Sequence, residues 1–191
     1  AGFTLHKLPE QTSASSIPAC LRDTAKKLAD LYPATVGAIL YQILSPDIRT
    51  GEYQYPHISS LTHNEETIPQ ILTDTINNRY ISYRSYIRSV LARRGSVMFV
   101  VPNSIDLDYA TQHLSSGIED RIVKFSPNQS KKERKQAYEA FEDTTIAKVI
   151  ITTSTHAYLD RVDLLSIIIE RSASNLYKNR TRPYLDHRTA L

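Results

Sequence analysis

Residues in the middle of the chain have the order that surrounds a phosphate-binding loop. Residues 68–72 are predicted as a short strand, residues 73–80 read Thr-Asp-Thr-Ile-Asn-Asn-Arg-Tyr, and a helix and the apolar run at 97–101 follow. In such loops glycines let backbone N–H groups point at phosphates, a lysine reaches the β and γ phosphates, and Ser or Thr holds Mg²⁺. This loop contains no glycine and no Gly-Lys-Thr. The sequence therefore predicts the order of a nucleotide site without its usual chemistry.

Basic clusters are the second group of residues that could do chemistry, by contacting nucleic-acid phosphates. Such contacts give affinity that depends on salt and not on base sequence. In the tail, Tyr177 and Tyr184 alternate with basic residues, a pattern that suits base stacking with single strands. The alternatives are solvated helix faces for the clusters and tyrosines packed at a sheet edge for the tail. The candidate nucleic-acid contacts are Arg84, Arg88, Lys131, Lys132, Lys178 and Arg182.

Three other groups of residues give no prediction of a metal site or a catalytic site. His57 and His63 have no carboxylate pair nearby in the right pattern, so no metal site is predicted. The residues Ser-Thr-His at 154–156 are interpreted as loop residues, because a Ser-His hydrolase needs a nucleophile on a sharp turn and no Gly-x-Ser-x-Gly is present. We expect Cys20, on the first helix, to be a buried packing residue rather than a nucleophile.

Composition sets the size and the compartment. With 191 residues, 41% of them hydrophobic, the chain can bury one good core. A formal net charge of +3 is compatible with nucleic acid without being diagnostic. A single cysteine excludes an internal disulfide and a cysteine-rich zinc site, which favours a reducing cytoplasm. No apolar run has the length of a membrane span and no signal core is seen, so we expect a cytoplasmic protein without a membrane partner.

The secondary-structure elements that position these residues follow two different sequence patterns, one before and one after the connector. Residues 1–50 are predicted as a helical hairpin, with helices that stop at Pro33 and before Pro46, and residues 51–67 as a connector. In residues 68–191 strands and helices alternate, which is typical of an α/β fold with a parallel sheet between flanking helices. Expected strands lie at 68–72, 97–101, 121–125, 147–151 and 165–169. Expected helices lie at 79–94, 106–114 and after Ser130, which forms a capping box with Glu133.

Several segments, in order, carry a family resemblance. Residues 28–49, the strand Val-Met-Phe-Val-Val-Pro at 97–102 and Ser-Lys-Lys-Glu-Arg at 130–134 contribute to it. So do Ile-Ile-Ile-Glu-Arg-Ser-Ala-Ser-Asn-Leu-Tyr-Lys at 167–178 and Arg-Pro-Tyr-Leu-Asp-His-Arg at 182–188. Together they resemble the primosomal replication-restart helicase family (primosomal protein N′, PriA). The resemblance implies a RecA-like, P-loop NTPase-like first helicase lobe, preceded by a small helical segment.

The departures from the family pattern bear on function. Counting back from Pro102, the resemblance places a degenerate nucleotide site at Ile76, Asn77, Asn78, Arg79 and Tyr80. Its acidic motif becomes Glu170 followed by Arg-Ser-Ala, so the residue that positions the attacking water is lost. We therefore expect no catalytic residue and no binding of ATP or Mg²⁺. The family's winged helix and second motor lobe are also expected to be missing.

The leading hypothesis is a pseudo-ATPase: a PriA-like lobe that acts as a DNA-binding or protein-docking module in DNA replication restart. Its expected partners are single-stranded or forked DNA and replication-restart proteins. One alternative is an ATP-dependent DNA helicase lobe in which Arg79 and Glu170 still hold a nucleotide and a second lobe or partner completes the site. Another is a structural adaptor that binds no nucleic acid.

Overall fold

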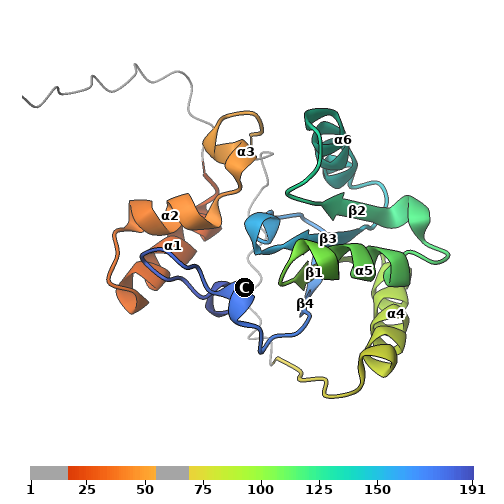
Figure 1. Ribbon diagram of the computed structural model, residues 1–191. Coiled ribbons are helices and arrows are strands. Elements are labelled where there is room, and N and C mark those ends of the chain that lie inside the picture. Colours follow the sequence, from red (N-terminus) through yellow and green to blue (C-terminus); the bar gives the residue numbers. More distant parts are fainter. Residues whose placement is uncertain (1–16, 55–68) are drawn as a thin grey trace, which may run out of the picture.

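The computed structural model describes residues 17–54 and 69–191. Within them, four parallel strands form one sheet in the order β2-β3-β1-β4, with helices on both faces (Figure 1). The predicted α/β fold with a parallel sheet is confirmed. The strands are β1 (Ser96–Val101), β2 (Ile122–Phe125), β3 (Val149–Thr153) and β4 (Leu164–Ile169). The helices are α1 (Ala19–Leu31), α2 (Val36–Ile43), α3 (Pro46–Arg49), α4 (Ile76–Ala92), α5 (Ser104–Leu114) and α6 (Lys131–Glu142).

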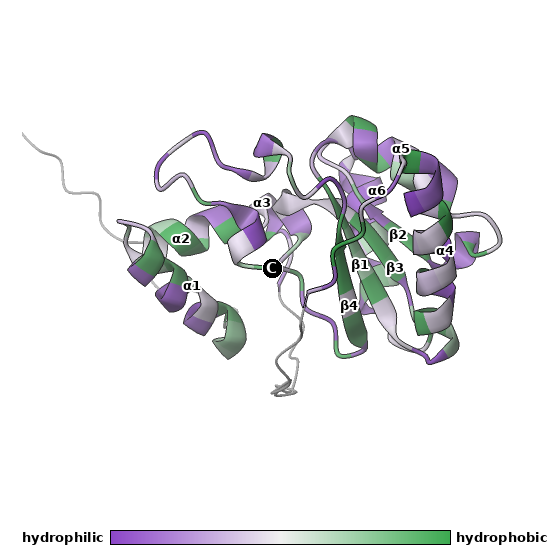
Figure 2. Cartoon of the chain, turned by 90° about the horizontal axis from the view of Figure 1, so that it is seen from below, coloured by the Kyte–Doolittle hydropathy of each residue, from purple (hydrophilic) through white to green (hydrophobic). Residues whose placement is uncertain are grey.

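Alternation along the central strand divides the core into two halves. Val97, Phe99 and Val101 of β1 pack with α4 and α5, whereas Met98 and Val100 pack with α6 on the opposite face. All six residues of β1 are buried, because it lies between two other strands and under helices on both sides. The apolar strands between more polar helix surfaces are visible in Figure 2. Since the strands are parallel, their carboxyl ends meet at one edge of the sheet.

Short capping signals fix where two helices begin. Ser130 accepts a hydrogen bond from the backbone N–H of Glu133, and the Glu133 side chain accepts from the backbone N–H of Ser130. The predicted capping box is therefore confirmed. Asn103 caps α5 in the same position by accepting from the N–H of Asp106 at 2.9 Å.

The two helices predicted within residues 1–50 are observed as α1 and α2, and residues 1–16 of that segment lie outside the described residues. Leu28 and Ile39 are buried between the two helices and against Tyr158 and Leu185, which come from the far end of the chain. In Figure 1 the C-terminal segment runs beside α1 and α2. The hairpin thus completes its core with residues that lie late in the sequence, so the helical segment and the last residues form one packed unit.

Two predictions about the start of the lobe are wrong. Residues 69–72 have no strand structure, and Ile71 and Leu72 are exposed; residue 68 lies outside the described residues. Two apolar residues after Pro69 find no burial, and β-structure needs burial against a partner to be stable. The helix expected at 79 begins instead at Ile76, so part of the expected loop is the first turn of α4.

Smaller corrections concern boundaries and one side chain. The strands predicted at 121–125 and 147–151 are observed at 122–125 and 149–153. The helix predicted at 106–114 is α5, which begins at Ser104. Residues 154–156 form a short 3-10 helix rather than a loop. Cys20 is exposed, so its predicted burial is wrong; it lies on the first turn of α1, and its Sγ is 4.0 Å from Asp160 Oδ2. In the part of the chain that the structure describes, no helix is both long and apolar enough to cross a membrane.

Candidate functional site

The carboxyl edge of the sheet brings together the two halves of the nucleotide site predicted from sequence. Glu170 follows β4, and its backbone N–H bonds to the carbonyl of Val100 on the neighbouring strand. Arg79 lies near the start of α4, and its side chain points toward Glu170. Its Nη2 is 2.6 Å from Glu170 Oε1. The structure therefore places the positive and the acidic position of the site in direct contact with each other.

This ion pair is closed rather than open to a ligand. The Glu170 side chain is 1% exposed and that of Arg79 is 19% exposed. Tyr83 donates to the other carboxylate oxygen of Glu170 at 2.8 Å, so both oxygens are occupied. Burial, and then the bond to Glu170, raises the pKa of Tyr83 and keeps it a donor. A magnesium ion at Glu170 would have to displace both partners.

The amino end of α4 is occupied as well. Free N–H groups at a helix start attract anions, which is the basis of phosphate-binding loops. Here the carboxylate of Asp74 lies at that end: its Oδ1 accepts from the N–H of Thr75 at 2.7 Å and from Asn78 Nδ2 at 2.9 Å. Arg79 also donates to the Asp74 carbonyl at 2.8 Å. A negative side chain thus lies beside the amino end of α4, where its charge disfavours a phosphate.

The remaining residues of the predicted site have structural positions. Tyr80 is 3% exposed and packs edge-on against Tyr83 and Tyr109, so its hydroxyl is no substitute for a metal-binding Ser or Thr. The residues Ile76, Asn77 and Asn78 are exposed on the first turn of α4. Within residues 17–54 and 69–191, no cluster of three or more His, Cys, Asp or Glu is placed to hold a metal ion. His57 and His63 lie outside the described residues.

The position after Glu170 adds a second ion pair. Arg171 Nη1 contacts both carboxylate oxygens of Asp106, at 2.9 and 3.1 Å. Arg171 has a φ of 51°, in the left-handed region that a non-glycine residue seldom adopts. Asp106 also accepts from Asn103 Nδ2 at 2.7 Å. The charges at this edge of the sheet therefore neutralise one another in pairs.

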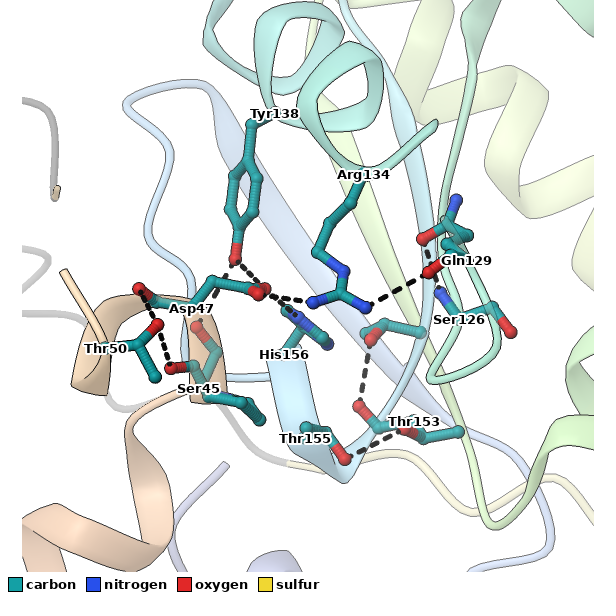
Figure 3. A network of polar contacts seen from close by, with 12 residues as sticks. Ser45, Asp47, Thr50, Ser126, Gln129, Arg134, Tyr138, Thr153, Thr155 and His156 are labelled. Atoms are coloured by element: carbon teal, nitrogen blue, oxygen red, sulfur yellow. Dashed lines mark hydrogen bonds and ion pairs between the residues drawn. The ribbon is translucent and has the colours of Figure 1, made fainter. Parts of the chain in front are cut away.

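A second cluster, which we call the junction cluster, joins α3 to the lobe. Its centre is Asp47, whose side chain is 4% exposed. Figure 3 shows how its two carboxylate oxygens meet Arg134 (2.6 Å), Tyr138 (3.0 Å) and His156 (3.1 Å). Burial raises the pKa of Asp47, but the hydrogen bonds from Arg134, His156 and Tyr138 outweigh it and the pKa is lowered. Asp47 is thus an ionised carboxylate with three donors.

The junction cluster contains residue types that are common in catalytic sites, but its polar atoms are not accessible to a substrate. Burial lowers the pKa of His156, although Asp47 acts in the opposite direction. The ring stacks on Phe125 with centroids 5.0 Å apart, and its Nδ1 is buried with no hydrogen-bond partner among the described residues. The Tyr53 ring covers Tyr138 at 3.7 Å. With its polar atoms under aromatic rings, the cluster serves to hold α3 and α6 together.

The predicted nucleic-acid residues do not form one surface. Arg84 and Arg88 lie on α4, whereas Lys131 and Lys132 begin α6 on the opposite face of the sheet. The exposed Arg88 bonds to the Ser116 carbonyl at 3.0 Å, Arg84 is half-buried, and the exposed Lys131 pairs with Glu52 at 2.9 Å. Two neighbouring basic residues, Arg79 on α4 and Arg134 on α6, form ion pairs with Glu170 and Asp47.

In the tail, Lys178 and Arg182 are exposed on the segment after β4, and the Arg182 carbonyl accepts a hydrogen bond from Gln42 of α2 at 2.9 Å. Tyr177, expected beside them as a stacking platform, is fully buried, and its hydroxyl donates to the carbonyls of Val100 (3.0 Å) and Glu170 (2.7 Å). Its ring is therefore closed to a base, while that of Tyr184 is exposed.

Sequence reasoning missed two carboxylates that decide this arrangement. Asp74 precedes the N-cap Thr75, and the Asp-Thr pair is itself a signal for a helix start at 76. Asp47 follows Ser45 and Pro46, a pattern that predicts a helix start but not the burial of the carboxylate. A scan of protein-family models and a search of curated proteins each found no match to the chain.

Proposed function

We propose that the chain is a catalytically inactive lobe, similar to the first motor lobe of the PriA family, that serves as a DNA-binding or protein-docking module in replication restart. The contact between Arg79 and Glu170 is the observation that carries the proposal. In an active site of this type the positive residue must face the phosphates and the acid must face the metal. Here each is the other's partner.

The cost of opening the site supports an inactive lobe. A nucleotide would have to separate the Arg79–Glu170 ion pair and remove the hydrogen bond from Tyr83. These contacts have to break before a phosphate reaches Arg79 or a metal ion reaches Glu170, and their loss lowers the net affinity for a nucleotide.

Calorimetric titration with Mg²⁺-ATP tests this part directly. We expect no saturable heat for the wild-type chain, and none for Arg79→Ala. Tight, magnesium-dependent binding that disappears in Arg79→Ala would refute the inactive lobe and favour the alternative of an ATPase lobe completed by a partner. Circular dichroism of both proteins controls for folding.

The nucleic-acid part of the proposal is supported by basic residues without acidic partners. In the described residues, no ion pair involves Arg84, Lys132, Lys178 or Arg182. Affinity for single-stranded or forked DNA should fall steeply with salt if such residues meet phosphates. An affinity that does not change with salt, or no binding at all, would favour the adaptor.

The protein-docking form of the module is favoured by the edge of the sheet. β4 is the last strand in the order, and in the described residues only β1 pairs with it. Leu165 is 55% exposed and Ile167 39% exposed on this strand. An open apolar edge accepts a further strand. Ile167→Lys should weaken co-sedimentation with purified replication-restart proteins, while Lys132→Glu leaves it unchanged; the reverse result would exclude the edge as the docking surface.

A further inference from the structure

A cavity of about 370 Å³ lies between the helical hairpin and the C-terminal segment, away from the nucleotide site. Its wall on one side comes from a single face of α2, where residues three and four apart are neighbours. The opposite wall is the segment after the 3-10 turn at Asn175–Tyr177. The lining residues are Ala38, Tyr41, Gln42, Arg49, Asn179, Thr181 and Arg182. We call this the hairpin cavity.

The charge of the hairpin cavity has one sign. Arg49 and Arg182 are its only charged lining residues, and neither belongs to any ion pair within residues 17–54 and 69–191. Lys178 and Arg180 are exposed on the same segment and add to the positive field. Guanidinium groups form bidentate hydrogen bonds with phosphate oxygens. The cavity is thus suited to an anion with several oxygens.

A chain of hydrogen bonds holds the polar wall in place. Gln42 Nε2 donates to the Arg182 carbonyl at 2.9 Å, and Gln42 Oε1 accepts from Asn179 Nδ2 at 2.6 Å. Asn179 Oδ1 lies 3.0 Å from Nε2 of the buried His187, whose Nδ1 lies 2.7 Å from the Tyr158 hydroxyl. Because an amide oxygen only accepts, His187 carries its proton on Nε2.

This chain leaves donors for a ligand. The amide groups of Gln42 and Asn179 each use one N–H in the bonds above and keep a second. The lining therefore combines two amide groups with two arginines, and the hydrogen-bond chain fixes the positions of the amides from the buried His187 outward. Such preorganisation lowers the cost of ordering the site when a ligand binds.

An aromatic surface lies beside the cationic one. The Arg49 guanidinium carbon is 4.3 Å from the centre of the Tyr41 ring, a cation–π contact. Tyr41 is nevertheless 65% exposed, so this contact leaves much of the side chain open to solvent. Bases of single strands stack on tyrosine rings and on arginine planes. The junction cluster anchors α3 through Asp47 and so fixes the position of Arg49 two residues later.

We propose that the hairpin cavity binds one nucleotide unit of single-stranded nucleic acid, with its phosphodiester between Arg49 and Arg182 and its base against the Tyr41–Arg49 stack. The inference rests on the nucleic-acid part of the proposed function and gives it a site. A cavity of this volume is at the small end of ligand sites, which suits a single unit. The aromatic platform is Tyr41, in place of the buried Tyr177.

An acidic protein segment is the competing occupant. Carboxylates would also pair with Arg49 and Arg182, but they would make no use of the exposed ring of Tyr41. Inorganic phosphate shares the chemistry of the phosphodiester and lacks the base. The ring therefore distinguishes nucleic acid from both.

The test is fluorescence anisotropy with a labelled oligo-dT of about 10 nucleotides, long enough for a typical single-strand site. The double variant Arg49→Ala/Arg182→Ala removes two charges in the cavity. Arg22→Ala/Lys27→Ala removes two exposed charges from α1, outside the cavity, and is the matched control. Tyr41→Ala removes the ring, and Tyr41→Phe keeps it. These side chains are exposed, and thermal melting checks that each variant folds.

We expect the cavity double variant to weaken oligo-dT binding about tenfold or more and to lower the salt slope by about 0.7 for each phosphate that the variant no longer neutralises. The α1 control should change affinity less than about twofold, because its two charges lie outside the cavity and their long-range effect is screened by salt. Tyr41→Ala should cost about tenfold and Tyr41→Phe less than about twofold.

Other outcomes overturn the proposal in distinguishable ways. Equal losses in the cavity and α1 double variants would show that only net charge matters; nucleic-acid binding would stand and the cavity would not. Binding of a poly-glutamate peptide as tightly as oligo-dT, with no effect of Tyr41→Ala, would assign the cavity to an acidic protein. Full displacement by inorganic phosphate with no effect of Tyr41→Ala would assign it to a free anion. If the wild type does not bind oligo-dT, both the cavity proposal and the nucleic-acid part of the proposed function are overturned.

Discussion

Replacing Asp47 by alanine should destabilise the protein more than any exposed carboxylate change. The side chain is 4% exposed and accepts hydrogen bonds from Arg134, Tyr138 and His156 at 2.6, 3.0 and 3.1 Å. Asp47→Ala leaves the charge of Arg134 without its partner and the buried Nε2 of His156 without its acceptor, whereas the Tyr138 hydroxyl keeps its contact with Ser45 Oγ at 3.3 Å. It also weakens the polar contact between α3 and α6, because this carboxylate is its centre.

The magnitude follows from what is left behind. Removing one partner of a buried ion pair costs about 3–5 kcal/mol, chiefly because the other charge stays desolvated. Arg134 retains a bond to the Gln129 carbonyl at 3.1 Å and its side chain is 25% exposed, so part of this cost is relieved. The unsatisfied His156 adds about 1–3 kcal/mol at most, and Tyr138 adds less because its hydroxyl keeps Ser45 as a partner. We expect a loss of about 3–4 kcal/mol, a large share of a typical total of about 5–15 kcal/mol.

Urea denaturation followed by circular dichroism measures the loss. Asp108→Ala is the matched control, since it removes an exposed carboxylate whose ion pair with Lys124 is equally short, at 2.6 Å. That change should cost less than about 1 kcal/mol. The double variant Asp47→Ala/Arg134→Ala should lose less than the sum of the two single variants. A loss below about 1 kcal/mol for Asp47→Ala, equal to the control, would refute the reasoning.

Three further predictions concern other buried polar groups. Tyr177→Phe removes the donor to Val100 and Glu170 and should lower the free energy of unfolding by about 1–2 kcal/mol, measured by urea denaturation; an unchanged stability would refute a net contribution from these two hydrogen bonds. Glu170→Gln should lower stability by about 1–3 kcal/mol, because the partly exposed Arg79 loses its counterion, and calorimetry should show no gain of ATP affinity. Burial lowers the pKa of His187 to about 4. As pH falls from about 6.5 the unfolded chain binds this proton first, so the wild type should lose up to about 3 kcal/mol by about pH 4, a slope that His187→Gln lacks. Parallel pH profiles of the two proteins would contradict the assignment.

Most of the lobe was predictable from local patterns. A continuous apolar run marked β1, because a buried parallel strand is apolar on both faces. Ser130 with Glu133 marked the start of α6, since capping acts within one turn. The same local reasoning failed at 69–72, where a strand would need a neighbour to pair with, and no local pattern reports whether one exists.

The candidate site divides along the same line. The sequence by itself determined that residues 73–80 lack the glycines and the lysine of a phosphate-binding loop, however these residues fold. Only the tertiary structure decided that Arg79 and Glu170 face each other, that Tyr177 is buried and that Tyr41 meets Arg49. Each of these facts depends on how the chain packs around the residue. Side-chain type and spacing set what a residue is able to do, whereas burial and partners across the fold set what it does.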